Sequence, residues 1–324
     1  MIDVRYERGV LLPAEQLWLD PFGPRELAFV SHAHSDHTAR HREVILTGAT
    51  SQLMGARQGT ARGVEHVMAF GERREFRGFQ IELRPAGHVL GSAQCFVTSD
   101  AGTLLYTGDF KLRAGLSCEL AETMRAETLV METTFGRPQY VFPPAEAVLR
   151  EIGEFCLAAH EDGATPVLLV YSLGKAQEVL ASLATVGLPI RLHRAVWEMT
   201  LVYQALGISF PPFEKCEDGR DISGGILICP PGSRSLLAWV SRPRTAAITG
   251  WALDPRTKFR MKVDAAFPFS DHAGYDDLLR CVELVSPKRV FTTHGFAREF
   301  ARDLRARGVE AWTLGGEDQM ELQL

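Results

Sequence analysis

The segment Leu27-Ala28-Phe29-Val30-Ser31-His32-Ala33-His34-Ser35-Asp36-His37 places three imidazoles and a carboxylate within six residues, directly after a short apolar run. Neutral imidazoles and carboxylates are the ligands that zinc prefers. The apolar run predicts a strand, and a tight turn at a strand end lets alternate side chains point into one cavity. The pattern therefore predicts a hydrolase site for two metal ions rather than a cluster of surface histidines.

Length and composition predict a globular protein. The chain has 324 residues, 46% of them hydrophobic, which is enough for two compact domains or one large one. The N-terminal residues lack the apolar core of a signal peptide, and no window approaches the roughly 18 apolar residues of a membrane span. We therefore expect a cytoplasmic protein with no membrane partner. The six cysteines form no Cys-x-x-Cys pair, which predicts reduced and mostly buried thiols.

The distribution of charge says more about partners than the total does. A net charge of −5 does not favour a nucleic-acid partner. Between residues 234 and 262, however, Asp254 is the only acidic residue, while the basic ones are Arg234, Arg242, Arg244, Arg256, Lys258, Arg260 and Lys262. A solvated basic face and a nucleic-acid contact both fit this run.

Four further apolar segments each lead to a polar residue that can bind a metal or move a proton. Alternation over 79–84 predicts a half-buried strand, with Phe79, Ile81 and Leu83 inside, that leads to His88. The other three strands are expected at Thr103–Tyr106 before Asp109, Thr128–Met131 before Glu132 and Arg289–Thr293 before His294. Because rigid strands fix positions while loops supply the chemistry, this placement predicts a site at one edge of a sheet.

The pattern of predicted elements changes between about residue 138 and residue 262, where strands alternate with helices. The buried strand Val167–Val170 is followed by a turn and a helix over Lys175–Ala184. A second strand, Gly225–Cys229, ends in a Pro-Pro-Gly turn that can open another helix. Strands that alternate with helices predict a parallel sheet, inserted here into the first domain.

Several of these motifs resemble a known family. The metallo-β-lactamase family is matched in order and spacing by Asp20, His32-x-His34-x-Asp36-His37, His88 and Asp109. Three further motifs resemble the β-CASP branch of nucleases within that family. They are Glu132, His272 in Phe269-Ser270-Asp271-His272, and His294 in Thr293-His294-Gly295. The segments 86–94, 173–177 and 229–232 resemble the bacterial exonucleases that are associated with a DNA ligase.

The resemblance covers nearly the whole chain and implies its architecture. The expected fold is α/β (α+β): a metallo-β-lactamase αββα sandwich with an inserted α/β cap, the β-CASP domain. The sandwich would comprise residues 1–137 and 263–324, and the cap would comprise residues 138–262.

The resemblance also implies a ligand set for two divalent metal ions. One ion would be held by His32, His34 and His88 and the other by Asp36, His37 and His294, with Asp109 bridging them. The imidazole-rich set favours Zn²⁺, while Mn²⁺ also fits a carboxylate-bridged pair. Asp20 would accept a hydrogen bond from a ligating imidazole and so fix its tautomer.

Catalytic roles are expected for Asp36, Glu132 and His272. No protein nucleophile is needed when two cations activate a water molecule. His272 would protonate the leaving oxygen, oriented by Glu132 or Asp271. Alternatively, His272 is a structural residue that binds Asp271.

Three cap residues are candidates for binding substrate: Ser172, Lys175 and Ser233. Each lies near a predicted helix start, where backbone N–H groups and the helix dipole favour a phosphate. An ordinary helix cap would place the same residues there.

The function implied is that of a metal-dependent DNA exonuclease in end processing or repair, in functional association with a DNA ligase. His294 favours the main alternative, an RNA-processing nuclease, because DNA-directed relatives generally carry an apolar residue at that position. A small-substrate metallo-hydrolase would not need the cap. A catalytically silent partner subunit would have lost ligands, whereas every ligand position is filled here.

Overall fold

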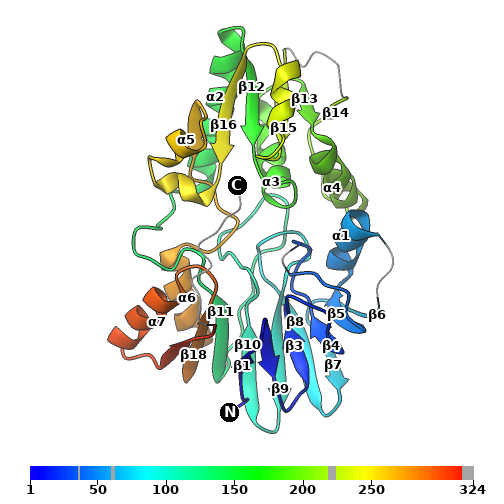
Figure 1. The fold of residues 1–324 in the computed structure, drawn as a ribbon, viewed down its shortest axis with the longest axis vertical. Helices are drawn as coiled ribbons and strands as arrows, with labels where there is room; N and C mark the ends of the chain where they lie inside the picture. The colour runs from blue at the N-terminus through cyan, green and yellow to red at the C-terminus, as the bar shows by residue number, and fades with distance from the viewer. Residues whose placement is uncertain (36, 60–62, 218–223, 316–324) are drawn as a thin grey trace. The chain divides into compact units, whose positions relative to one another are not determined.

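The computed structural model describes residues 1–35, 37–59, 63–217 and 224–315 (Figure 1). The chain divides into two compact units. Unit 1 comprises Met1–Val141 and the described residues from His272 onward, and unit 2 comprises Phe142–Asp271. Unit 2 thus begins four residues and ends nine residues after the limits predicted for the cap, whose assignment as a domain stays a proposal. No helix in the described part of the chain is long and apolar enough to span a membrane.

Unit 1 contains two mixed sheets. Sheet A has six strands in sequence order: β1 (Arg5–Tyr6), β2 (Val10–Leu12), β3 (Leu17–Leu19), β4 (Leu27–Phe29), β5 (Glu43–Thr47) and β6 (Val64–Met68). Sheet B has the order β19-β18-β11-β10-β9-β8-β7, with β7 (Arg73–Phe76), β8 (Phe79–Pro85), β9 (Ala93–Ser99), β10 (Gly102–Tyr106), β11 (Thr128–Glu132), β18 (Arg289–Thr293) and β19 (Ala311–Thr313).

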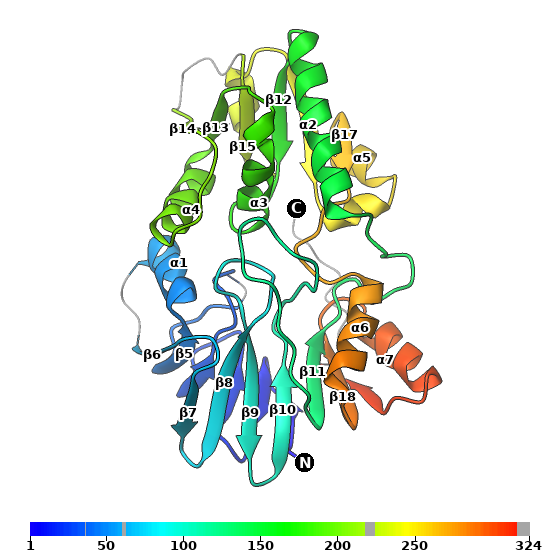
Figure 2. The same cartoon turned by 180° about the vertical axis from the view of Figure 1, so that it is seen from behind.

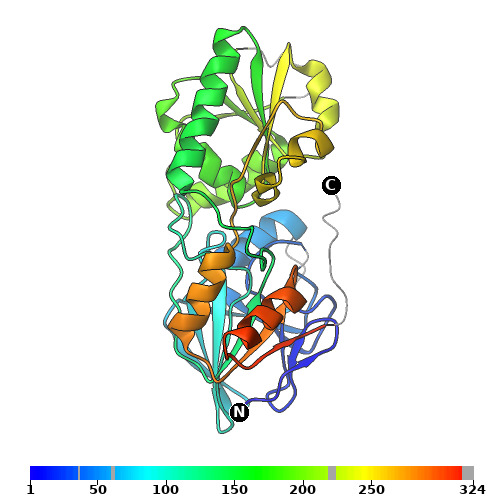
Figure 3. The ribbon, with the colours of Figure 1, turned by 90° about the vertical axis from the view of Figure 1, so that its left-hand side faces the viewer.

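The layers of unit 1 follow from where its apolar side chains lie. One hydrophobic cluster joins Leu12 and Phe29 of sheet A to Leu83 and Leu104 of sheet B, so the sheets pack face to face. The other face of sheet B is covered by α6 (Tyr275–Val285) and α7 (Ala297–Ala306) (Figure 3). Helix α1 (Gly48–Gln58) contacts β5 and β6 of sheet A. The expected αββα sandwich is therefore confirmed.

The strands expected to lead to the site are present. Strands β10, β11 and β18 pair in parallel, so their carboxyl ends lie at one edge of sheet B. Asp109 follows β10, Glu132 ends β11 and His294 follows β18. One detail of the alternation differs from the prediction: Glu82 of β8 is buried rather than exposed, because Arg73 donates to it at 2.7 Å and Arg84 also pairs with it.

Unit 2 is built on a six-stranded sheet, sheet C, in which all strands are parallel, as predicted for the insertion. Its order is β14-β13-β15-β12-β16-β17, with β12 (Thr165–Leu169), β13 (Ile190–Leu192), β14 (Glu214–Lys215), β15 (Ile226–Cys229), β16 (Pro243–Ile248) and β17 (Ala265–Phe267). The α-helices are α2 (Ala145–Glu161), α3 (Lys175–Ser182), α4 (Arg194–Ala205) and α5 (Thr257–Arg260), and the 3₁₀ helices are η1 (Leu183–Thr185), η2 (Arg234–Trp239) and η3 (Gly250–Leu253).

The two faces of sheet C are covered unequally. Alternate residues of β12 point to opposite faces, with Leu168 on one and Val167 on the other. The Leu168 face packs against α2, α3 and α4, which lie toward the viewer in Figure 2. The Val167 face packs against η2 and against Met261 and Val263, which follow α5. The helix predicted after the Pro-Pro-Gly turn is thus only the short η2.

The cysteines and three further histidines, His41, His66 and His193, lie away from the predicted metal ligands and have structural surroundings. All six cysteines lie in the described part of the chain, where none forms a disulfide and only Cys118 is not buried. His66 binds Glu43 at 2.8 Å, and His193 caps α4 by accepting from the backbone N–H of Ala195. His41 is buried, and its Nδ1 accepts from the backbone N–H of Arg25.

We expect His41 to make stability depend on pH. Burial lowers its pKa from an ordinary 6.5 to about 4. Between these values the unfolded chain binds a proton that the folded chain does not, so the free energy of unfolding falls as pH drops from 6.5 to 4. Because most of this difference in pKa takes effect by pH 4.5, we expect a loss of about 2 kcal/mol. Asparagine at this position keeps an acceptor for Arg25 and removes the titration.

Urea unfolding of the natural chain and of His41→Asn at pH 7 and pH 4.5 measures this effect. Losses at the metal centre are common to both chains and cancel in the comparison. Equal losses of stability in the two chains would show that His41 does not titrate as proposed.

Candidate metal centre

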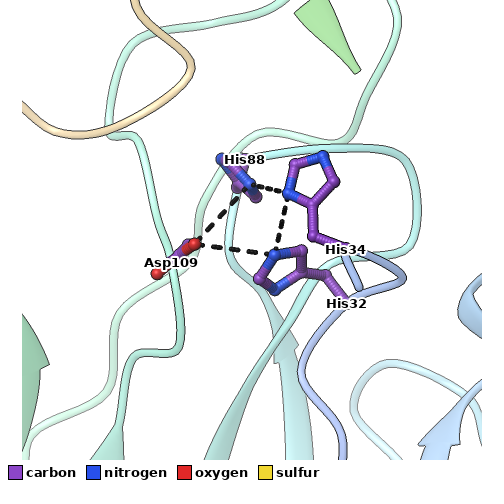
Figure 4. A group of neighbouring side chains, drawn as sticks. All are labelled: His32, His34, His88 and Asp109. Atoms are coloured by element: carbon purple, nitrogen blue, oxygen red, sulfur yellow. Dashed lines mark hydrogen bonds and ion pairs between the residues drawn. The ribbon is translucent and has the colours of Figure 1, made fainter. Parts of the chain in front are cut away.

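Three imidazoles and one carboxylate converge in unit 1 (Figure 4). His34 Nδ1 lies 3.0 Å from His32 Nε2 and 3.1 Å from His88 Nε2. Asp109 Oδ2 lies 3.5 Å from the same atom of His32 and 3.9 Å from that of His88. His32, His88 and Asp109 are buried and His34 is half-buried. All four ligand atoms lie within 4.8 Å of one another.

This donor set fits a divalent metal ion. Ligands about 2.0–2.2 Å from a tetrahedral zinc ion lie roughly 3.3–3.6 Å from one another, close to the separations of the four atoms. A metal also needs neutral imidazoles. Burial, followed by the nearby His37 and His88, lowers the pKa of His32 well below its usual value, which keeps that ring neutral. The cluster is therefore suited to hold one ion.

Asp109 also reaches a second group of possible ligands. Its Oδ2 lies 3.4 Å from His37 Nε2, and the ring of His294 is centred 5.8 Å from that of His37. Burial opposes the charged form of His37, but Asp109 and Asp20 outweigh it and raise the pKa of His37 well above its usual value. Two carboxylates thus create a place for positive charge beside His37. From this position Asp109 can contact two ions.

The predicted partner of this second group, Asp36, lies outside the described residues. The structure therefore brings together every predicted metal ligand that it describes: His32, His34, His37, His88, Asp109 and His294. Their assignment to two ions stays a proposal. The Nδ1 atom of His294 lies 3.0 Å from Thr293 Oγ1, which fixes the orientation of that ring.

Asp20 is buried behind the ligands and is held by three hydrogen bonds. It accepts from Ser31 N at 2.8 Å, from Ser31 Oγ at 2.6 Å and from Tyr106 OH at 2.9 Å. Its Oδ2 lies 3.2 Å from His37 Nδ1, and Ser31 Oγ lies 2.9 Å from His32 Nδ1. Asp20 thus orients His37 directly and His32 through Ser31. Sequence reasoning did not single out Ser31 or Tyr106, although Ser31 directly precedes the motif.

The loops that carry the ligands are tightly fitted. Gly108 has a φ of +54°, and a Cβ atom on it would lie 2.6 Å from that of Ser31, so only glycine lets Asp109 take its place. Arg57, in the last turn of α1, donates to the carbonyl of Ala33 at 2.6 Å and so holds the histidine motif from outside. These contacts limit the movement of the ligands before a metal binds.

His272 lies beside the cluster and is oriented by Glu132. Its Nδ1 atom lies 3.0 Å from Glu132 Oε1, and its ring is centred 4.6 Å from that of His88. Glu132 is buried and also accepts from the backbone N–H groups of Phe110 and Thr134 at 3.3 and 2.9 Å. Of the two partners expected for His272, Glu132 makes this bond, while Asp271 lies 2.9 Å from Lys175 Nζ.

The three candidate substrate-binding residues follow two neighbouring strands of unit 2. Ser172 and Lys175 follow β12 and Ser233 follows β15, and these strands are adjacent and parallel. Lys175 begins α3, as expected, but it is 5% exposed and its ammonium group is paired with Asp271. Ser172 and Ser233 are half-buried. Phosphate binding by these residues stays a proposal. A phosphate at Lys175 would have to share its positive charge with the carboxylate of Asp271.

Known proteins resemble the chain both in part and along its whole length. Residues 258–314 match RMMBL, the Zn-dependent metallo-hydrolase RNA specificity domain. A protein named "Probable DNA ligase" from Opitutus terrae is 51% identical over 325 residues, which cover 99% of this chain and 32% of that protein.

More distant relatives include proteins named for RNA and for DNA. An RNase J-like protein from Methanocaldococcus jannaschii is 26% identical over 48% of this chain and 42% of its own length. The human DNA cross-link repair 1A protein is 23% identical over 88% of this chain and 30% of its own length. The chain therefore spans less than half the length of each of these relatives.

A solved structure shares the fold. It is a protein of unknown function from Enterococcus faecalis that is 12% identical, with a TM-score of 0.58 over 90% of this chain and 79% of that one.

Proposed function

The chain belongs to the β-CASP branch of the metallo-β-lactamase family, and from this membership we propose that it is a metal-dependent nuclease that shortens DNA from an end in repair or end processing. The observation that carries the proposal is the convergence of His32, His34, His88 and Asp109 beside the His272–Glu132 pair. The first group is suited to hold a metal ion, and the second is suited to deliver a proton.

We propose DNA rather than RNA as the substrate because of the relatives that the chain resembles. The protein named "Probable DNA ligase" aligns with 99% of this chain, which corresponds to about a third of it. An exonuclease that trims broken ends would supply substrates to a ligase, so we propose a functional association with a DNA ligase. The resemblance to the human DNA cross-link repair 1A protein also supports DNA.

Each residue of the centre has a part in the proposed reaction. His32, His34 and His88 would hold one ion, and Asp36, His37 and His294 would hold the other. Asp109 would contact both. When bound, such ions lower the pKa of water and offset the negative charge of a phosphodiester. Glu132 holds His272 by Nδ1, so the proton for the leaving oxygen would come from Nε2. Asp20 and Ser31 would keep His37 and His32 in position.

An RNA-processing nuclease is the second candidate. The ring of His294 is centred 5.8 Å from that of His37, which supports a role as a ligand for the histidine that RNA-directed relatives carry. The matched RNA specificity domain and the RNase J-like relative also favour this reading.

End-labelled single strands of DNA and RNA of one sequence, each with and without a 5′-phosphate, test the proposal. The purified chain is supplied with zinc or manganese, and Asp109→Ala serves as the inactive control. We expect stepwise shortening of DNA that is absent in the control, and the label shows its polarity. Preferential shortening of RNA would show that RNA, not DNA, is the substrate. Internal cuts would show an endonuclease instead of an exonuclease. If the strands stayed intact with either metal, the chain would not be a nuclease.

A further inference from the structure

One face of sheet C in unit 2 leaves aromatic side chains exposed. The Leu168 face is covered by three helices, whereas the Val167 face has mainly η2 and the four-residue α5 (Figure 1). Trp239, the last residue of η2, is 55% exposed, and Phe259 of α5 is 76% exposed. Phe259 is the most exposed of the large apolar side chains that the structure describes. Most of the apolar surface of this ring therefore lies in water, where a ligand with a flat face could cover it.

Basic residues surround Phe259. Lys258 and Arg260 are its neighbours in α5, Lys262 follows two residues later, and all three are exposed. The single carboxylate of the 234–262 run, Asp254, binds Arg256 at 3.0 Å and lies 3.7 Å from Arg260. That carboxylate balances one of these positive charges. The segment Lys258–Lys262 therefore presents an aromatic ring within excess positive charge; we call it the α5 patch.

We propose that the α5 patch binds single-stranded nucleic acid, with a base stacked on Phe259 and phosphates next to Lys258 and Lys262. This inference rests on the proposed function, which supplies a polyanionic strand. Proteins that hold single strands combine a basic surface with rings on which bases stack, since every base has a flat face. Trp239, on the same face of sheet C, offers another ring to such a strand.

A nucleic acid fits the α5 patch better than a protein does. Lysine is depleted at the centres of protein interfaces, whereas here lysines lie on both sides of the exposed ring. A strand of phosphates would neutralise these charges and release bound counterions. The patch therefore has the composition of a strand-binding surface.

Binding without cleavage tests the proposal. The full chain carrying Asp109→Ala is titrated into labelled single strands of oligo-dT and oligo-U at several salt concentrations. Phe259→Ala is expected to weaken binding at least about fivefold, which corresponds to the low end of stacking on one base. The double variant Lys258→Gln/Lys262→Gln is expected to reduce the slope of log affinity against log salt by about 1.4.

The matched controls lie on α2, which packs on the other face of sheet C. Leu157→Ala removes a side chain that is 39% exposed, and Arg150→Gln removes an exposed charge. Both are expected to change affinity less than about twofold. Thermal unfolding verifies that each variant is folded. The proposal is overturned if Phe259→Ala binds strands as the controls do. It is also overturned if this variant loses only binding to a DNA ligase, which would identify the patch as a protein interface.

Hydrolysis of a small nitrophenyl phosphodiester by chains that keep Asp109 separates this proposal from the proposed function. Phe259→Ala should hydrolyse it at the natural rate, because the ring would act on strand binding alone. If Phe259→Ala hydrolyses the ester normally and binds strands as the natural chain does, only the proposal for the α5 patch is contradicted. If the natural chain cleaves neither this ester nor an oligonucleotide, the proposed function is contradicted. The strand titrations then still test whether the α5 patch binds nucleic acid.

Discussion

Replacing Asp109 by alanine is expected to reduce phosphodiester cleavage at least about 1000-fold, equivalent to about 4 kcal/mol of transition-state stabilisation. The carboxylate lies 3.4–3.9 Å from nitrogen atoms of His32, His37 and His88. Burial raises the pKa of Asp109, but His37 and His272 outweigh burial and hold it well below its usual value, so the group supplies a full negative charge. Without that charge, the imidazoles of the centre would have to hold the metal ions with no shared carboxylate between the two groups.

Two measurements on the purified protein check this prediction: initial rates on labelled DNA and metal content by elemental analysis. The bound metal is expected to fall together with the rate. His66→Gln is the matched control, because this histidine binds Glu43 away from the centre. A variant at Asp109 that keeps both its metal and more than a tenth of the natural rate would exclude the carboxylate as a shared ligand.

The second large effect is expected from His272→Ala, which should lower the rate on DNA about 100- to 10,000-fold, the usual contribution of a positioned proton donor. The alkoxide that leaves from DNA needs a proton, whereas a nitrophenolate leaves without one. The same variant should therefore hydrolyse a nitrophenyl phosphodiester at nearly the natural rate. Glu132→Gln keeps a hydrogen-bonding side chain but loses the charge, and should show a smaller loss on DNA alone.

Comparison of the two substrates distinguishes proton donation from a structural role. If His272→Ala lost both activities equally, the imidazole would be positioning the metal ligands rather than protonating the leaving group. Loss of the decline in rate at high pH for DNA, with thermal stability unchanged, would support proton donation further.

The metal centre could largely be predicted from the sequence, because strands deliver ligands at their ends. His32, His34, His88 and Asp109 each follow a short apolar run, and that local pattern is readable without a structure. Their supports depend on pairings between distant residues. Tyr106 donates to Asp20 across 86 positions, and Lys175 pairs with Asp271 across 96 positions. The burial of Glu82 likewise depends on arginines from its own sheet, which periodicity does not show.

The order in which the chain is made has a consequence for when the centre can act. Strand β18 lies between β11 and β19 in sheet B, and His294 follows it, so unit 1 is completed by residues made after all of unit 2. A growing chain on the ribosome can contain the whole of 142–271 while sheet B still lacks an interior strand. The second group of ligands is then incomplete, so a nascent or prematurely terminated product would stay inert toward the nucleic acids around it. Activity would begin only after residue 294 has been made and β18 has joined sheet B.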